Sequence, residues 1–254
     1  MFDAQDFAAR LSARDDRWSL LKDFAAEWHG PLKRGDGYPA SELNAAEKRL
    51  GLKLPEALRE WYGLAGRRED VFAMQNLLVS PEELEVEDGL LEFYYENQGV
   101  VTWGIKPDDM HLPDPPVYLN DSGMHNEPQE LIRENETLSE FALQMAICEM
   151  IITREPLRLK SNARDDKNAV AKIEMVERKY LHLGFPDWHW PNFPVRFYGA
   201  DDTIAVVIER QWLDLVANNQ AAFTKAKEFL DLEQLDDNDR GEHTTHGREG
   251  LLRH

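Results

Sequence analysis

The sequence lacks several features that would define a protein class at once. A single cysteine, Cys148, excludes an intrachain disulfide and favours a reducing compartment, so we expect a cytoplasmic protein. No apolar run approaches the roughly 20 residues needed to span a bilayer, so we expect no membrane association. The first residues contain no basic region followed by an apolar stretch, and we therefore expect no secretory signal.

Recognisable catalytic and cofactor motifs are also missing. The sequence has no glycine-rich phosphate-binding loop, no His-Glu-x-x-His pair and no Cys-x-x-Cys pair. These patterns would supply a phosphate cradle, a catalytic zinc site or a redox and structural metal site. We therefore predict that the chain binds no cofactor and no metal. We also predict that it is not an enzyme.

Acidic residues dominate the charge. The chain has 48 acidic and 29 basic side chains, and a net charge of −19. This charge repels nucleic acid and anionic membranes and attracts a basic protein. Residues 82–142 contain sixteen acids and two bases, Lys106 and Arg133, so this segment alone carries −14. Such a run is typical of a solvated surface that maintains solubility, and it is also the pattern of a face that binds a basic partner.

The hydrophobic pattern predicts a mixture of helices and strands without a strict βαβ alternation. Helices are predicted over residues 1–30 with a break at 12–15, and over 41–50, 55–63, 137–152, 170–180 and 220–232. Strands are predicted over residues 71–74, 90–95, 99–105, 117–119, 195–198, 203–209 and 212–216. The fold class that follows is α+β, with a mostly antiparallel sheet flanked by helices.

The chain divides into four regions on the same evidence. Residues 1–40 form an N-terminal helical extension and residues 41–153 the principal domain. Residues 154–235 contribute a helix, hairpin strands and a further helix that complete the same fold, and 154–166 read as an exposed loop. Residues 236–254 are polar and contain glycine, which predicts a flexible tail.

Several helix and core positions can be predicted in detail. Ser41 is placed to cap the helix over 41–50, and the sequence Thr137-Leu138-Ser139-Glu140 has the form of a capping box. Apolar spacing predicts that one face of a helix pair is buried by Leu43, Leu50, Leu54, Leu58 and Trp61. The helix over 137–152 is predicted to carry an apolar stripe of Phe141, Met145 and Cys148.

An ordered series of local patterns runs through residues 41–146. It comprises Glu47-x-x-Leu50-Gly51-x-x-Leu54-Pro55 followed by Trp61-Tyr62 and Gly66, then Glu96-Asn97-Gln98-Gly99-Val100 and Trp103-Gly104, then Asp114-Pro115-Pro116-Val117, and finally Leu138-Ser139-Glu140-Phe141. The series resembles the SUKH superfamily, which groups bacterial immunity proteins with a yeast regulator of cell-wall synthesis. The resemblance implies a SUKH-like α+β domain without catalytic activity, and a role in neutralising a cognate toxin, often a nuclease.

The acidic segment and the resemblance together give the leading functional hypothesis. We predict an immunity-type protein that binds a basic partner, such as a cognate toxin, through an acidic face. The predicted contact residues are Glu92, Glu96, Asp108, Asp109 and Asp114. A regulatory scaffold with an endogenous partner is the alternative from another class.

Three further constellations have a chemical and a structural interpretation. Asp108-Asp109-x-His111-x-x-Asp114 has the atoms of a divalent-metal site, and a metal-dependent hydrolase is the third hypothesis, although the spacing fits no known pattern. Asp121-Ser122-x-x-His125 has the atoms of a hydrolase triad, but an Asx turn at residues 120–123 is favoured. The aromatic loop over residues 188–194 either fills the core, which is favoured, or lines a binding groove.

Overall fold

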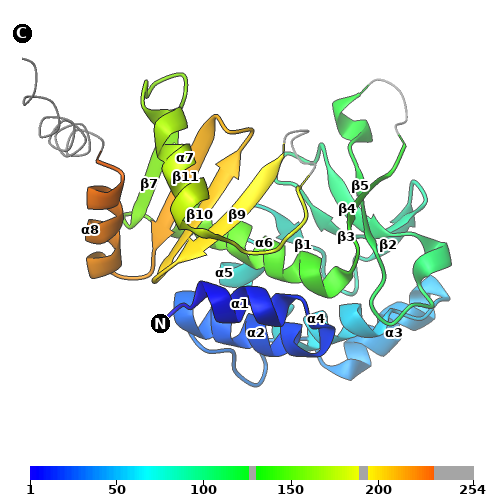
Figure 1. Cartoon of the computed structure of the whole chain (residues 1–254). Coiled ribbons are helices and arrows are strands. Elements are labelled where there is room, and N and C mark those ends of the chain that lie inside the picture. The colour runs from blue at the N-terminus through cyan, green and yellow to red at the C-terminus, as the bar shows by residue number, and fades with distance from the viewer. Residues whose placement is uncertain (126–129, 189–193, 232–254) are drawn as a thin grey trace, which may run out of the picture.

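A computed structural model describes residues 1–125, 130–188 and 194–231 of the chain. The described strands form two sheets with antiparallel pairing throughout. Figure 1 shows the two sheets beside each other, with helix α6 (Leu138–Thr153) passing beneath both and the N-terminal helices below it. The expected α+β class, with antiparallel strands and flanking helices, is confirmed. The predicted tail over 236–254 lies outside the described residues.

The first sheet has six strands and follows the chain order closely. Strands β1 (Leu77–Leu78) and β2 (Glu85–Glu87) both pair with β3, and the order continues through β4, β5 and β6. The bounds of these four strands are β3 (Leu90–Tyr95), β4 (Thr102–Ile105), β5 (Val117–Asn120) and β6 (Ile132–Asn135). Asp88 and Gly89 join β2 to β3 with φ angles of 47° and 82°. Positive φ at both positions is typical of a tight type I′ hairpin turn.

The second sheet has five strands in the order β7-β11-β10-β9-β8. Their bounds are β7 (Arg158–Asn162), β8 (Leu181–His182), β9 (Val195–Ala200), β10 (Thr203–Ile208) and β11 (Trp212–Ala217). The two faces of β10 pack differently: Ile204 and Val206 join the main core, whereas Ala205 and Val207 join a separate cluster under the outer helices. The sheet is therefore buried on both faces, which explains the continuous apolar run in this strand.

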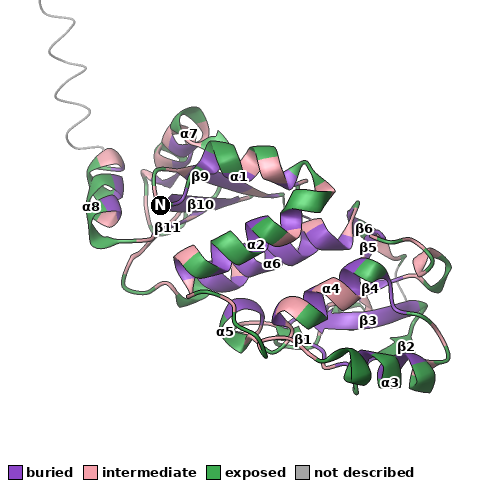
Figure 2. Cartoon of the chain, turned by 90° about the horizontal axis from the view of Figure 1, so that it is seen from below, coloured by how far each residue is buried: buried purple, intermediate pink, exposed green. Residues whose placement is uncertain are grey.

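Helix α6 is buried on nearly every side. It contacts α2, α4, α5 and strands of both sheets, and Figure 2 shows it lying behind α2 and coloured largely as buried. The predicted apolar stripe is therefore too narrow a description, because Leu143 and Ile147 on other faces are also buried. A helix that is apolar all round is typical of the centre of a core.

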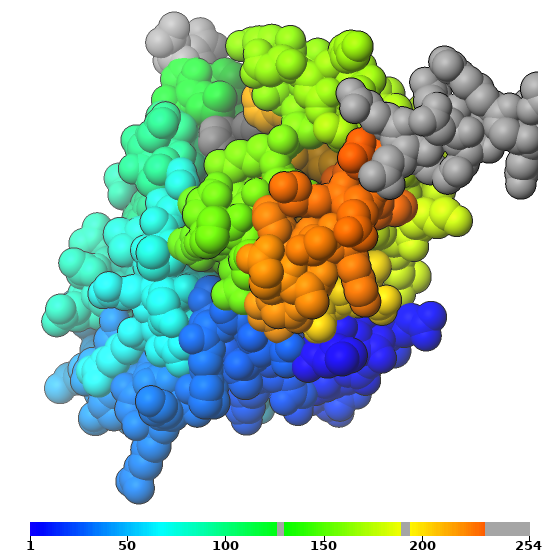
Figure 3. Space-filling model, turned by 90° about the vertical axis from the view of Figure 1, so that its left-hand side faces the viewer, coloured from blue at the N-terminus to red at the C-terminus, as the bar shows by residue number. Residues whose placement is uncertain are grey.

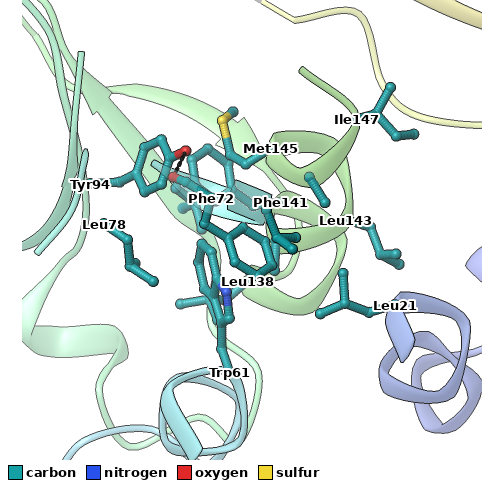
Figure 4. Packing of buried hydrophobic residues seen from close by; sticks show 14 of the residues in the cluster. Leu21, Trp61, Phe72, Leu78, Tyr94, Leu138, Phe141, Leu143, Met145 and Ile147 are labelled. Atoms are coloured by element: carbon teal, nitrogen blue, oxygen red, sulfur yellow. Dashed lines mark hydrogen bonds between the residues drawn. The ribbon is translucent and has the colours of Figure 1, made fainter. Parts of the chain in front are cut away.

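An aromatic cluster joins α4 (Glu56–Ala65) to the first sheet and to α6. The ring of Trp61 lies 5.9 Å from Phe93 and 6.2 Å from Phe141, both in edge-to-face contact. Figure 4 shows Trp61 and Phe141 approaching each other from different helices. The predicted inward position of Trp61 is confirmed, as are those of Leu43, Leu54 and Leu58, whereas Leu50 is only partly buried.

Helices α3 (Ala40–Leu50) and α4 are fastened together by the carboxylate of Glu47. It accepts hydrogen bonds from the Leu54 amide at 3.1 Å, from Arg59 at 2.8 Å and from Lys53 at 2.7 Å. Burial opposes its ionisation, but these three donors together lower the pKa of Glu47. Helix α3 begins at Ala40, with Pro39 at the N-cap position. Ser41 therefore lies inside the first turn, and its predicted role as the helix cap is wrong.

The N-terminal helices α1 (Ala4–Leu11) and α2 (Arg14–Trp28) are part of the main core. Asp3 caps α1 by accepting hydrogen bonds from the amides of residues 5 and 6. The Phe7 ring lies 6.1 Å from Phe185 of the C-terminal half, and Leu21 and Phe24 of α2 are buried. Residues 1–40 therefore connect the two halves of the molecule.

Two predicted elements differ from the structure. Residues 71–74 were predicted as a strand, but Glu69–Phe72 form the short helix α5, because the acidic first turn of Glu69 and Asp70 favours a helix N-terminus. Residues 154–166 were predicted as a loop, yet they contain β7. This polar strand is held against β11 by backbone pairing and by an ion pair of Arg158 with Asp214 at 2.8 Å.

The outer face of the second sheet is covered by α7 (Ala169–Lys179) and α8 (Gln220–Phe229). Ile173 and Val176 of α7 pack with Ala226 of α8 and with the strands, forming the second apolar cluster. The rings of Tyr180 and Phe229 stack at 5.7 Å. The C-terminal segment thus has a sheet and a small core of its own.

Candidate functional site

Two of the predicted contact residues have their carboxylates inside the first sheet. Glu92 on β3 is 4 % exposed and accepts hydrogen bonds from the Tyr95 hydroxyl at 2.6 Å and the Thr102 hydroxyl at 2.9 Å. Burial and the adjacent Glu92 carboxylate both raise the pKa of Tyr95. Glu96, 9 % exposed, accepts a bond from the Gln98 amide at 2.8 Å and shapes the turn between β3 and β4. Both side chains stabilise the sheet and offer little surface to a partner.

Asp114 lies at the N-terminus of α6. Its two carboxylate oxygens accept bonds from the backbone amide of Ser139 at 2.9 Å and from the Ser139 hydroxyl at 2.6 Å. Arg14 and Arg17 of α2 approach the same carboxylate at 3.3 Å and 3.8 Å, and only 6 % of the Asp114 side chain is exposed. The structure therefore assigns Asp114 to fixing α6 and α2, which leaves it unavailable as a contact.

The predicted capping box at residues 137–140 is not formed. Thr137 makes no side-chain cap bond, and its hydroxyl instead accepts a hydrogen bond from Arg17. Asp114, which is distant in sequence, supplies the cap. The local pattern predicted the start of the helix correctly but the capping group wrongly. A nearby carboxylate is a stronger hydrogen-bond acceptor than a hydroxyl, so Asp114 and not Thr137 binds the Ser139 amide.

Asp108 and Asp109 remain at the surface. They form a short 3₁₀ turn, η1 (Pro107–Asp109), in which Asp108 is exposed and Asp109 accepts a bond from the Tyr118 hydroxyl at 3.1 Å. Burial and the Asp109 carboxylate raise the pKa of Tyr118. Of the five predicted contacts, these two are the ones that a partner can reach most readily.

The structure also bears on the candidate metal site and the candidate hydrolase triad. Within residues 1–125, 130–188 and 194–231, no group of His, Cys, Asp and Glu side chains is placed to hold a metal ion. His125 contacts Asp121 at 3.3 Å, while the Ser122 amide donates to Asn120 at 3.0 Å. That bond confirms the Asx turn that was favoured at residues 120–123.

The aromatic loop begins inside the core. Trp188 is 8 % exposed and its ring lies 6.0 Å from Trp103, so these two rings connect the second sheet with the first. The favoured core interpretation is confirmed for Trp188, and residues 189–193 lie outside the described part of the chain.

Exposed acids gather instead along β2 and its flanking turns, at an edge of the first sheet. We call this surface the acidic edge; it consists of Glu82, Glu83, Glu85, Glu87 and Asp88, all of them exposed, with no basic residue between them in the sequence. Arg49 of α3 lies beside this segment and donates hydrogen bonds to the backbone carbonyls of Pro81 and Leu84. In the described part of the chain β2 pairs only with β3, so its other edge has no strand neighbour. This edge is a ready surface for a basic protein.

One residue of the acidic edge lies opposite another acid of the first sheet. Glu85 on β2 lies directly opposite Glu92 on β3 in the antiparallel register. Like charges directly opposite each other in an antiparallel strand pair are expected to destabilise a sheet. Glu85 is therefore not expected to contribute to the stability of the sheet.

Sequence reasoning missed β2 and therefore most of the acidic edge. The pattern that marks it is present, since Asp88-Gly89 lies between Glu87 and Leu90 and is a strong hairpin signal. The strand was overlooked because its residues Glu85-Val86-Glu87 are all exposed and give no buried face. Val86 is 46 % exposed and leaves an apolar position among the acids.

One more buried carboxylate serves the fold. Glu149 of α6 is fully buried and accepts bonds from the amides of Met74 at 2.9 Å and Gln75 at 2.5 Å, and from the Asn76 side chain at 2.8 Å. It holds the segment between α5 and β1 against the helix. A carboxylate that accepts several backbone N–H bonds can be buried at modest cost.

Comparison with known proteins gives no relative of this chain. No family model, no curated protein and no solved structure matches it. In the part of the chain that the structure describes, no helix combines the length and apolar character needed to cross a bilayer.

Proposed function

We propose that this chain is a non-catalytic, immunity-type binding protein that covers a basic surface of a cognate toxin with its acidic edge. The observation that carries this proposal is that the acidic residues fall into two groups, one bonded within the fold and one exposed. Glu92 and Asp114 are bonded within the fold, whereas the residues of the acidic edge are exposed along a strand with one free side.

The physical rationale is charge complementarity. A nuclease toxin needs positive charge to hold phosphates, and an acidic inhibitor is attracted by the same charge. Complementary fields mainly raise the association rate and orient the partners, while a few buried contacts set the lifetime of the complex. Val86, surrounded by glutamates, is positioned to supply an apolar contact of this second kind.

Three further features support this function. The resemblance of residues 41–146 to SUKH proteins implies immunity, and Glu47 in that pattern fastens the α3–α4 unit. Ser122 of the candidate triad donates its amide to Asn120 in an Asx turn, and Asp114 of the candidate metal cluster is bonded to Ser139 and lies next to the arginines of α2. We also propose a cytoplasmic location, in which the single thiol of Cys148 stays reduced.

The test requires a candidate toxin encoded beside the gene. Association of the purified pair is measured by stopped flow over a range of salt concentrations. The edge variant carries Glu82→Gln, Glu83→Gln, Glu85→Gln and Glu87→Gln. The matched control removes four exposed charges on α2, α4 and α5 through Asp15→Asn, Asp16→Asn, Glu56→Gln and Glu69→Gln. A third variant, Asp108→Asn with Asp109→Asn, tests the contacts predicted from sequence.

We expect the edge variant to associate roughly tenfold more slowly at low salt, with a flatter salt dependence than the control. The difference should fade at 1 M salt, where the Debye length is about 3 Å. Equal rates for the edge variant and the control would assign the effect to net charge and refute the acidic edge as the steering surface.

A further inference from the structure

Two Asp-Gly dipeptides occur in the chain, Asp36-Gly37 and Asp88-Gly89, and the structure describes both. In such a dipeptide the glycine nitrogen can attack the aspartate carboxyl and close a five-membered succinimide ring, because glycine has no side chain that hinders the approach. The attack requires a carboxyl that is free to move and a peptide plane that is free to turn. The two sites differ in both respects.

The carboxyl of Asp88 is free to move. Asp88 and Gly89 are both exposed, and in the described part of the chain the Asp88 carboxylate has neither a hydrogen bond nor an ion pair. A Cβ built on Gly89 would have no atom within 4 Å beyond those of the adjacent residues. The side chain and the peptide that follows it can therefore change conformation without displacing other groups.

The hairpin turn also holds the Asp88 backbone close to the reactive conformation. The φ angles of 47° at Asp88 and 82° at Gly89 are those of a type I′ turn. Rotation of the single peptide plane between them gives a type II′ turn, in which the first residue keeps its positive φ and has a ψ of about −120°. At this ψ the Gly89 nitrogen lies on the side of the Asp88 side chain and can reach Cγ. Glycine accepts either sign of φ, so the ring can close while β2 and β3 stay paired.

The carboxylate of Asp36, in contrast, is held by the fold. It accepts hydrogen bonds from the Lys33 amide at 2.7 Å and from the Arg68 guanidinium at 3.1 Å. The bond from the Lys33 amide is the main cause that lowers the pKa of Asp36, and Arg68 adds to it. An ionised carboxyl lacks the hydroxyl that must leave as water, so these contacts oppose ring closure chemically as well as sterically.

The peptide plane after Asp36 is fixed too. The Asp36 carbonyl accepts a hydrogen bond from the Arg67 amide at 2.8 Å. Gly37 packs so closely on α4 that a Cβ at this position would lie 1.9 Å from the carbonyl oxygen of Gly63. Rotation of this plane would break the first contact and collide at the second, so the same dipeptide is reactive in one place and protected in the other.

We propose that Asp88 is a modification site at which the folded chain converts aspartate to isoaspartate, whereas Asp36 is protected. The Gly89 nitrogen forms a bond to Cγ of the protonated Asp88 carboxyl, and the carboxyl hydroxyl leaves with the amide proton as water. Water then opens the ring. Attack at Cγ restores aspartate, and attack at the original backbone carbonyl leaves the chain running through Cβ and Cγ with a free carboxylate on Cα.

The product should disturb β2 and little else. Isoaspartate lengthens a two-residue turn by one backbone carbon, and the three residues of β2 are all exposed and contact mainly β3. We therefore expect β2 to separate from β3. The junction of the two halves lies elsewhere: α1 packs on β8 and β9, and Figure 3 shows the blue N-terminal residues against the yellow and orange C-terminal half.

The test ages the full chain in mildly acidic buffer at physiological temperature, both folded and unfolded in urea. Isoaspartate is labelled by an isoaspartyl methyltransferase with radioactive S-adenosylmethionine, which methylates the carboxylate on Cα, and each site is resolved by peptide mapping. In the folded chain we expect at least about tenfold more isoaspartate at position 88 than at position 36. In urea the two sites should agree within about twofold, because neither is held by the fold.

The variant Asp88→Glu is the control, because its ring would need six members; it should remove the label at position 88 and leave position 36 unchanged. Equal labelling of the two sites in the folded chain, or no labelling at position 88, would overturn the proposal. A ratio in urea as large as in the folded chain would assign the difference to flanking sequence and would overturn it as well.

Hydrogen exchange tests the structural consequence on the aged protein. In the isoaspartate fraction the β2 amides should exchange at least about threefold faster than in fresh protein, while those of β9 keep their rate. Unchanged exchange in β2 would show that the lengthened turn still pairs the two strands, which contradicts this part of the proposal.

Discussion

The carboxylate of Asp114 accepts a 2.6 Å hydrogen bond from the hydroxyl of Ser139 and a 2.9 Å bond from its amide, so a residue of the loop before β5 caps helix α6. The helix is the centre of the main core, and the same carboxylate also faces Arg14 and Arg17. One side chain therefore fixes the position of α6 relative to α2 and the first sheet.

Removal of this cap should be costly. We expect Asp114→Ala to lower the free energy of unfolding by roughly 2–3 kcal/mol, because a helix cap and charge-assisted hydrogen bonds are lost together. Urea unfolding measures the change. Asp108→Ala, at the exposed turn nearby, should change stability by about 0.5 kcal/mol or less. Equal stability of the two variants would restore Asp114 as a surface contact.

This contact shows why the sequence predicted the elements better than the site. Apolar spacing locates Trp61 and Leu58 in the core, because burial follows directly from periodicity. A carboxylate gives no such signal, since Asp108 and Asp114 look alike in the sequence while their environments differ completely. The pairing of Asp114 with Ser139, 25 positions away, depends on the tertiary fold.

The second sheet illustrates a related limit. The hairpin of β9 and β10 follows from its apolar residues and the turn before Thr203. By contrast, β7 consists of Arg158-Leu159-Lys160-Ser161-Asn162 and owes its extended form to pairing with β11. A polar strand at a sheet edge has no local pattern that separates it from a loop, so its discovery required the structure.

The aromatic cluster provides a prediction about packing. Trp61 is fully buried between Phe93, Tyr94 and Phe141, and Trp61→Ala should destabilise the protein by roughly 3–5 kcal/mol through lost contacts and a cavity. Trp212, which is 47 % exposed, is the matched control, and Trp212→Ala should cost about 1 kcal/mol or less. Thermal and urea unfolding give both values. Similar losses for the two tryptophans would contradict the core assigned to α4.

His29 should make stability depend on pH. Burial lowers its pKa from 6.5 to about 4; Asp70 opposes this shift, and Arg68 and Arg154 add to it. Between these two pH values the unfolded chain binds the proton and the folded chain does not. Stability is therefore retained above pH 6.5 and falls as the pH drops towards 4, by up to roughly 3 kcal/mol from this group.

The measurement compares the wild type with His29→Gln by urea unfolding at several pH values. Carboxylates titrate equally in both proteins, so the difference between them isolates the histidine. We expect the wild type to lose stability relative to the variant as the pH falls from 6.5 to 4. A constant difference across that range would show that His29 titrates at its ordinary pKa.

The lone thiol is on a partly buried side chain and should react slowly in the folded protein. Burial raises the pKa of Cys148, and the nearby Glu149 and Glu134 add to this effect. Because the thiolate is the reactive form, a disulfide reagent at pH 8 should label the native chain roughly a hundredfold more slowly than the chain unfolded in guanidinium. The thiol introduced by Ala221→Cys on the exposed side of α8 is the control. Comparable rates for the two thiols would mean that α6 is open to solvent at Cys148.

The final prediction concerns the unfavourable pair of Glu85 and Glu92, which face each other across β2 and β3. Glu92 is needed by Tyr95 and Thr102, so relief must come from Glu85. We expect Glu85→Thr to stabilise the protein by roughly 0.2–1 kcal/mol, because it removes a like-charge pair and adds a residue that favours strands. Glu87→Thr is the matched control, since Glu87 lies opposite the uncharged Leu90 and relieves no such repulsion.

The same substitution links stability to function. If the acidic edge steers a basic partner, Glu85→Thr should slow association at low salt while it raises the unfolding midpoint. Such a trade-off is expected where a surface is retained for binding at a cost in stability. Urea unfolding and stopped-flow association on the same preparation measure both quantities. A variant that gains stability and keeps its association rate would show that Glu85 is not part of the binding surface, and a variant that gains none would show that the repulsion is already screened by solvent.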